Sequence, residues 1–186
     1  NIPEKLVIVS TISSPLYKGF DVILKTASII KNFLRVDFEW KVYGNINPVY
    51  VESQIEIKHS DVNVSICGVA KPEELRHALL NCTVYVHPSY IDNSPNSLCE
   101  AQILSCSVIA TNVGGVSSMV KEGETGYLVP ANDPYQMAFA IINLYMDRKL
   151  NISIGNNARK EALERHDPHK IISNLFKVYE RVMIVK

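Results

Sequence analysis

The sequence predicts an α/β fold, a doubly wound parallel sheet of about six strands followed by a helical C-terminal tail. Three observations predict it. Short apolar runs rich in branched residues alternate with longer stretches whose apolar residues recur every three or four positions. The chain between successive runs is long enough for the helical crossover that parallel neighbours need. After Pro134 the helical spacing continues without another strand-like run.

In the first half of the chain, three strands alternate with three helices. The KLVIVS run over residues 5–10 is short, apolar and rich in branched residues, as buried strands are. The second strand-like run, over residues 38–43, ends at Gly44. Pro72 fits the first turn of the third helix because its φ is already helical. The expected order is a strand over 5–10, a helix over 19–33, a strand over 38–43, a helix over 49–58, a strand over 62–66 and a helix from 72 onward.

The second half repeats the alternation and then becomes helical. Its strand-like runs are again short and apolar, and the segments between them have helical spacing. The expected order is a strand over 83–87, a helix over 95–105, a strand over 108–111, a short helix over 116–121, a short strand over 127–129 and helices over 134–147, 150–165 and 168–182. No repeat or linker divides the chain, so we expect a single Rossmann-like domain over residues 1–186.

Composition and charge exclude several classes of protein. Apolar residues make up 47% of the 186 residues and charged residues 20%, which is typical of a folded globular domain. Nineteen basic residues balance nineteen acidic ones, which argues against nucleic acid as a partner. The cysteines form no CxxC pair, so we expect four buried, reduced thiols in a cytoplasmic protein, with a zinc or disulfide role as the alternative. They are Cys67, Cys82, Cys99 and Cys106.

The loops that follow the predicted strands are where a ligand is expected, because doubly wound sheets bind ligands outside the carboxyl ends of their strands. The most informative of these loops is HPSYIDNSPNSLCE at residues 87–100. Ser94 would cap a helix whose first position is Pro95. A helix N-terminus of this kind binds phosphate through its free N–H groups. Here these groups belong to Asn96, Ser97 and Leu98.

Two carboxylates bracket this helix start. Asp92 lies in the loop and Glu100 in the helix, with seven residues between them. A carboxylate beside a sugar accepts hydrogen bonds from hydroxyl groups, so either acid would suit a ribose or hexose ring. Taken by spacing alone, both acids are equally consistent with ordinary turn and helix-dipole residues.

Several segments resemble the signature of glycosyltransferase family four, whose members have the two-domain GT-B fold. PSYIDNSPNSLCEAQILSCSVIATNVGG resembles the family's Pro-Ser, acid, seven residues, glutamate and later Gly-Gly turn. KEGETGYLVPANDP resembles its G-x-T-G-x-L-V-x-x-x-D segment, YKGF its K-G after the first strand, and GNNAR its G-x-x-A-R. The segments occur in the family's order and span nearly the whole chain.

The resemblance implies a role for each of these residues. Lys18, beside Gly19, would neutralise a donor diphosphate and stabilise the leaving nucleotide. Glu100 would hold the ribose, and Asp92 would contact the transferred sugar. Further donor contacts would come from the amides of Asn96, Ser97 and Leu98, from Gly68 and Val69 at the nucleobase, and from Gly114 and Gly115 near the sugar. No metal or other cofactor is expected, since the chain has no Asp-x-Asp motif.

Plainer interpretations compete with some of these roles. Lys18 is also consistent with a solvated lysine, and Gly114 and Gly115 with a simple turn. His87 is the last residue of a predicted strand, and we expect a structural histidine there rather than a base. The other histidines are expected at the surface: His59, His77, His166 and His169.

The chain departs from the family pattern at several positions. The family has an arginine five residues before the lysine, and this chain has Ser13. Arg76 and Lys71 are the candidates for the missing charge. Asp92 is one methylene shorter than the usual glutamate, and Ser118 replaces an acid after the Gly-Gly pair. These changes bear on activity more than on fold.

The resemblance also implies that the chain is the C-terminal half of a larger enzyme, which begins here at Asn1 and lacks the N-terminal, acceptor-binding domain. The whole enzyme would transfer a hexosyl unit from a nucleoside diphosphate sugar to a saccharide or lipid-linked acceptor, with retention of anomeric configuration. The enzyme would be cytoplasmic, and it would lie at the inner face of the membrane if the missing half contacts lipid. Two alternatives stay open: a GT-B relative such as a nucleotide-sugar epimerase, and a binding domain that has lost catalysis.

Overall fold

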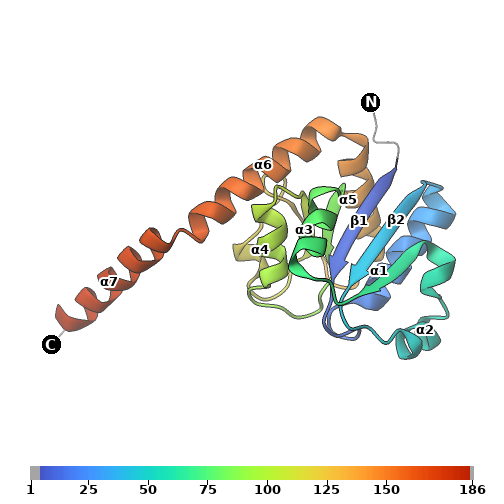
Figure 1. Ribbon diagram of the computed structural model, residues 1–186, viewed down its shortest axis with the longest axis horizontal. Helices are drawn as coiled ribbons and strands as arrows, with labels where there is room; N and C mark the ends of the chain where they lie inside the picture. The colour runs from blue at the N-terminus through green and yellow to red at the C-terminus, as the bar shows by residue number, and fades with distance from the viewer. Residues whose placement is uncertain (1–4, 185–186) are drawn as a thin grey trace.

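A six-stranded, entirely parallel sheet forms the centre of the structure, a computed structural model that describes residues 5–184 (Figure 1). The strands lie in the spatial order β3 (Val64–Gly68), β2 (Phe38–Tyr43), β1 (Leu6–Thr11), β4 (Val84–His87), β5 (Val108–Thr111) and β6 (Tyr127–Val129). The chain reverses its direction across the sheet between β1 and β4, which is the switch point where doubly wound folds bind ligands. The predicted fold class is confirmed.

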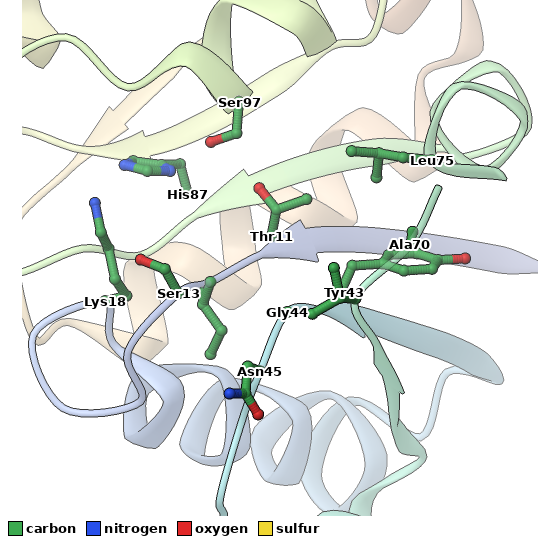
Figure 2. Close-up of a pocket in the computed structure, with 12 residues that line it drawn as sticks. Thr11, Ser13, Lys18, Tyr43, Gly44, Asn45, Ala70, Leu75, His87 and Ser97 are labelled. Carbon is green, nitrogen blue, oxygen red and sulfur yellow. The ribbon is translucent and has the colours of Figure 1, made fainter. Parts of the chain in front are cut away.

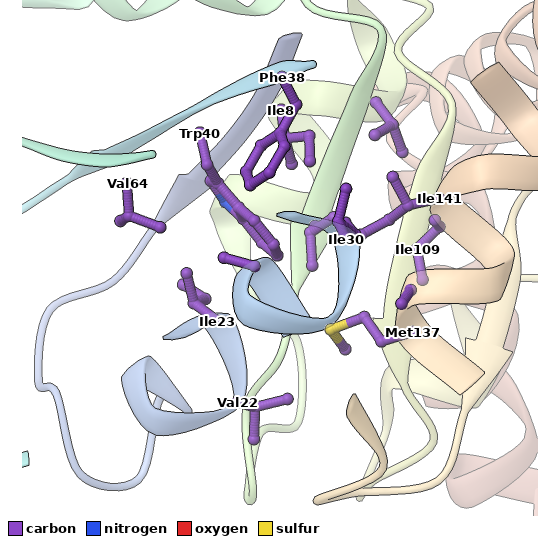
Figure 3. Close-up of a cluster of buried hydrophobic side chains, with 14 of the residues drawn as sticks. Ile8, Val22, Ile23, Ile30, Phe38, Trp40, Val64, Ile109, Met137 and Ile141 are labelled. Carbon is purple, nitrogen blue, oxygen red and sulfur yellow. The ribbon is translucent and has the colours of Figure 1, made fainter. Parts of the chain in front are cut away.

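Helices cover both faces of this sheet. Alternate strand residues point to opposite faces, so Ile8 packs with α1 and α5, whereas Val9 packs with α3 and α4. Figure 3 shows the larger of these two cores, in which Trp40 lies between the sheet and α1. The helices are α1 (Phe20–Ser28), α2 (Val49–Ile55), α3 (Pro72–Leu80), α4 (Asn96–Ile103), α5 (Pro134–Met146), α6 (Arg148–Arg165) and α7 (Pro168–Ile184).

A buried hydrogen-bond relay joins the three central strands. The Trp40 indole N–H on β2 donates to Ser10 Oγ on β1 at 3.0 Å, and that hydroxyl donates to the Val86 carbonyl on β4 at 2.7 Å. Trp40 and Ser10 are both fully buried. Because each buried polar group has its partner, the relay fixes the relative position of β2, β1 and β4 without leaving an unsatisfied group.

The structure differs from the sequence prediction at several element ends. The helix expected over 19–33 continues past α1 as a π-helical segment, Ile29–Leu34, and the one expected over 116–121 is a short 3₁₀ turn, Val116–Ser118. Val62 lies in a 3₁₀ turn rather than a strand, because Asn63 has a φ of 57° and interrupts the extended backbone before β3. Cys67 is exposed and Cys82 is only partly buried, so the expectation of four buried thiols is wrong for Cys67 and is fully met by Cys99 and Cys106 alone.

The last helix, α7, extends away from the body of the domain (Figure 1). Its side chains are exposed from residue 168 to residue 183, and many of them are large and apolar: Ile171, Ile172, Leu175, Phe176, Val178, Tyr179, Val182 and Met183. Among residues 5–184, no helix combines the length and apolar character that a membrane crossing requires.

Candidate functional site

Two hollows lie side by side at the carboxyl ends of the strands. The larger, of about 430 Å³, is lined by Lys18, His87 and Ser97, with Lys18 and His87 together at one end (Figure 2). The second, of about 390 Å³, is lined by Glu100 of α4 and by residues of α3. Ala70 and Leu75 line both, and Ser97 and Glu100 are one turn apart on the same face of α4. The two hollows therefore follow α4 as one crevice.

Lys18 and Asp92 meet at the end of the larger hollow, although 74 positions separate them in the chain. The Lys18 ammonium donates to Asp92 Oδ2 at 2.5 Å, and both side chains are mostly buried. Burial opposes ionisation of Asp92, but the hydrogen bond from Lys18 and the neighbouring His87 outweigh it and hold the pKa of this carboxyl below its usual value. The adjacency of β1 and β4 brings the two loops together.

Gly19 sets the spacing of these loops. Its φ is 75°, and a Cβ at this position would lie 2.0 Å from the carbonyl oxygen of Pro88. No side chain fits in that space, so the loop after β1 can approach the loop after β4 only with glycine here. Gly19 thus contributes to the site by packing, and its predicted contact with the donor stays a prediction.

His87, which the sequence marked only as a structural histidine, belongs to the same cluster. Its ring is 1% exposed, and Nε2 lies 2.9 Å from Asp92 Oδ2 and 3.1 Å from Ser89 Oγ. Burial lowers the pKa of His87, although Asp92 opposes this effect. A neutral ring beside a carboxylate must carry its proton on Nε2. His87 Nδ1 is buried and has no partner among the described residues.

The start of α4 differs from the prediction. Pro95 occupies the cap position with an extended ψ of 117°, and no side chain caps the helix, so the capping role given to Ser94 is wrong. The Leu98 N–H donates to the Pro95 carbonyl at 3.1 Å and is not free. The N–H groups of Asn96 and Ser97 have no partner in the part of the chain that the structure describes. Two amides rather than three are therefore free for a ligand, and of these two residues Ser97 lines the larger hollow.

Arg76 and Lys71, the two candidates for the positive charge missing at position 13, differ in their position relative to the crevice. Arg76 lines the second hollow with Glu100, whereas Lys71 lines neither hollow. Ser13 lines the larger hollow, where the resemblance places an arginine. Arg76 thus lies at the Glu100 end of the crevice rather than beside Lys18. Glu100 itself is exposed and accessible to a ligand.

The predicted glycines have different surroundings. Gly68 has a φ of 73° with open space around it, and the next residue, Val69, is 79% exposed and lines the larger hollow. A Cβ on Gly114 or Gly115 would lie 2.1 Å and 2.3 Å from the backbone oxygens of Asp92 and Asn93. This glycine pair therefore packs against the loop that carries Asp92, and its contact with a donor stays a prediction.

The structure adds residues at or next to the crevice that the sequence analysis did not single out. Tyr85 on β4 is buried, its hydroxyl lies 2.8 Å from Thr11 Oγ1, and burial raises its pKa to about 12. Tyr43, the last residue of β2, and Asn45 in the loop after it line the larger hollow. A polar residue within a buried strand is the only sequence feature that singles out Tyr85.

Comparison with proteins of known sequence gives relatives of greater length. A glycosyltransferase of Methanocaldococcus jannaschii, itself uncharacterized, is 26% identical over 165 residues, which are 89% of this chain and 45% of that protein. The D-inositol 3-phosphate glycosyltransferase of Paenarthrobacter aurescens is 30% identical over 153 residues, which are 78% of this chain and 36% of that enzyme. The chain thus spans less than half the length of these relatives.

Solved structures share the fold. Sucrose-phosphate synthase from Thermosynechococcus elongatus superposes with a TM-score of 0.80 at 20% identity, over 98% of this chain and 47% of that one. The Anabaena protein HepE, solved in complex with UDP-glucose, gives 0.79 at 16% identity, over 97% of this chain and 50% of that one. The sequence profile of the family described as glycosyl transferases group 1 matches residues 1–161, and the chain belongs to this family.

Proposed function

We propose that this chain binds a nucleoside diphosphate sugar and is the donor-binding domain of a retaining, metal-independent glycosyltransferase. The supporting observation is the crevice along α4, which is lined by the ammonium of Lys18 in one hollow, by the carboxylate of Glu100 in the other and by Ser97 at the N-terminus of α4, whose amide has no partner among the described residues. The diphosphate would lie between Lys18 and the amides of Asn96 and Ser97, since an ammonium and a helix N-terminus both stabilise phosphate charge. Glu100 would accept hydrogen bonds from the ribose hydroxyls.

The two ends of the crevice suit the remaining parts of the donor. Asp92, at the Lys18 end, would accept hydrogen bonds from the hexose. The exposed apolar side chain of Val69 and the open space at Gly68 suit the face of a nucleobase. When the glycosidic bond breaks, negative charge grows on the leaving nucleotide. Lys18 and the amides of α4 are placed to stabilise this charge without a metal ion.

The acceptor and the rest of the enzyme would lie outside this chain. This chain covers 45% of its Methanocaldococcus jannaschii relative, and the exposed apolar side chains of α7 form a surface that another part of the same polypeptide would cover. We assign that part to an N-terminal domain, which would bind the saccharide or lipid-linked acceptor and make any peripheral membrane contact in the cytoplasm.

Calorimetry on this chain tests donor binding directly. UDP, GDP and ADP are titrated in turn, followed by the sugar nucleotides of whichever base binds. Glu100→Ala should weaken the nucleotide by about 10- to 100-fold, as expected for hydrogen bonds to a charged group. Its melting temperature should not change, because Glu100 is exposed. Glu180→Ala, an exposed glutamate on α7, is the matched control. If no nucleotide binds, the proposal is wrong.

Assays on the whole protein separate transfer from the alternatives. With radiolabelled donors and an added acceptor, we expect transfer of the sugar, and proton NMR of the first product should show the donor's anomeric configuration. Isomerisation of the donor without transfer would instead identify an epimerase. Donor binding without either reaction would identify a binding domain.

A further inference from the structure

The charges at the Lys18 end of the crevice do not match those of a diphosphate. Lys18 and His87 are the basic side chains that line the larger hollow in the described chain. The ammonium of Lys18 is already paired with Asp92 at 2.5 Å. The diphosphate of a nucleotide sugar carries two negative charges, so the hollow with a neutral His87 offers almost no net positive charge to receive it.

His87 has an unused nitrogen at this position. Nε2–H donates to Asp92 Oδ2 at 2.9 Å, which leaves Nδ1 as a bare acceptor that is buried and without a partner among residues 5–184. A buried polar atom without a partner is uncommon in folded proteins and points to a ligand or a change of protonation. On protonation, Nδ1 becomes a donor while Nε2 keeps its hydrogen bond to Asp92.

We propose that His87 takes up a proton when a nucleoside diphosphate sugar binds, so that its imidazolium becomes the second cation of the donor site. The inference rests on the function proposed above. The proton comes from solvent and goes to Nδ1, and no covalent bond of the donor changes. Lys18 then directs its charge to the diphosphate, and the protonated His87 holds Asp92 in place.

The charges around His87 support this coupling. In the empty site burial lowers the pKa of His87, Asp92 raises it and Lys18 lowers it. Among the described residues, the other elements contribute Ser97 of α4, which lines the same hollow, and Thr111 of β5, whose hydroxyl bonds to the His87 carbonyl, and both are uncharged. A bound diphosphate adds two negative charges beside the ring and draws the charge of Lys18 toward itself. Both changes raise the pKa of His87, so protonation and donor binding favour each other.

Calorimetry in two buffers of different ionisation enthalpy counts the protons. The probes are UDP-glucose, UDP-N-acetylglucosamine, GDP-mannose and ADP-glucose, whose diphosphates are diesters that do not titrate near neutral pH. For the donor that binds, we expect uptake of about one proton per site. As pH rises from the pKa of His87 in the free protein to its pKa in the complex, the affinity for the donor should fall about tenfold per pH unit. Above the pKa in the complex, the affinity should level off.

His87→Gln separates the two ring nitrogens. The glutamine amide reaches the Nε2 position and still donates to Asp92, but it cannot titrate. We expect proton uptake near zero, and a donor affinity about tenfold or more below wild type on the acidic side of neutrality. His169→Gln, an exposed histidine on α7, is the matched control and should behave as wild type. Nitrogen NMR of labelled histidines in the unmutated chain gives an independent measurement, since Nδ1 of His87 should change from its unprotonated to its protonated shift.

The outcomes distinguish this inference from the function on which it rests. Donor binding without proton uptake refutes the role of His87 and leaves the donor site in place. Uptake that persists in His87→Gln assigns the proton to another group and also refutes it. If none of the four donors binds, the proposed function is wrong, and the inference about His87 is then wrong as well. Should His87→Gln fail to fold, the NMR measurement on the unmutated chain decides.

Discussion

Replacing Gly19 by alanine tests whether one glycine sets the distance between the two loops of the donor site. An L-residue at a φ of 75° costs about 1–2 kcal/mol relative to glycine. The new Cβ would lie 2.0 Å from the Pro88 oxygen, far inside the ordinary contact distance of 3.4 Å. Relief of this overlap requires a backbone shift, which adds about 1–3 kcal/mol as in other overpacked sites. We therefore expect Gly19→Ala to lower the free energy of unfolding by about 2–5 kcal/mol.

Gly123→Ala is the matched control, because Gly123 has a φ of 72° and no atom within 4 Å of its Cβ position. It should lose only the conformational part, about 1–2 kcal/mol. Urea unfolding of both variants gives the two free energies, provided that the m-values agree. Calorimetry should then show weaker donor binding for Gly19→Ala alone, since the shift moves the loop of Lys18 out of its place beside the loop that carries Asp92. Equal destabilisation of the two variants would refute the argument from close packing.

Three further predictions test the site and the core. Lys18→Ala should weaken a nucleoside diphosphate by about 10- to 100-fold in calorimetry and the free nucleoside hardly at all, whereas equal losses would make Lys18 structural. Ser10→Ala should lower the free energy of unfolding by about 2–4 kcal/mol, because it leaves the Trp40 N–H without an acceptor and removes the hydrogen bond to the Val86 carbonyl. An unchanged midpoint of urea unfolding would show that the relay does not stabilise the fold. The pKa of Asp92 lies below its ordinary value of 3.8, so its contribution to stability is present above that pH and is lost as pH falls through the lower folded pKa. The stability difference between wild type and Asp92→Asn should therefore shrink in acid unfolding, and a constant difference would exclude the ion pair as its source.

The order and type of most elements could be predicted because local patterns determine them. The runs at β1 and β2 are apolar and branched, and the helices between the strands have their own period. Element ends were less predictable, since they depend on single backbone conformations. Asn63 in the left-handed region moved the start of β3, and the extended ψ of Pro95 removed the expected cap.

The candidate site could be predicted only in part, for a similar reason. The sequence indicated Lys18, Asp92 and Glu100 through a resemblance, but not that the first two form an ion pair, because that contact depends on the adjacency of β1 and β4. For His87, the sequence showed only that it ends a predicted strand. The role of His87 depends on the rotamer that directs Nε2 to Asp92 and leaves Nδ1 without a partner among the described residues. The spacing of residues in a sequence carries no information on side-chain rotamers.

The pairing of β1 with β4 has a mechanical consequence. Six positions pair β1 with β2, whereas only two, Ile8 with Val84 and Val9 with Tyr85, pair β1 with β4. The sheet therefore consists of two three-stranded halves held by a short seam, and Lys18 and Asp92 lie on opposite sides of it. A ligand bound by groups from both halves would add contacts across the seam between β1 and β4. Bound nucleotide should therefore raise the force at which the two halves of the sheet separate.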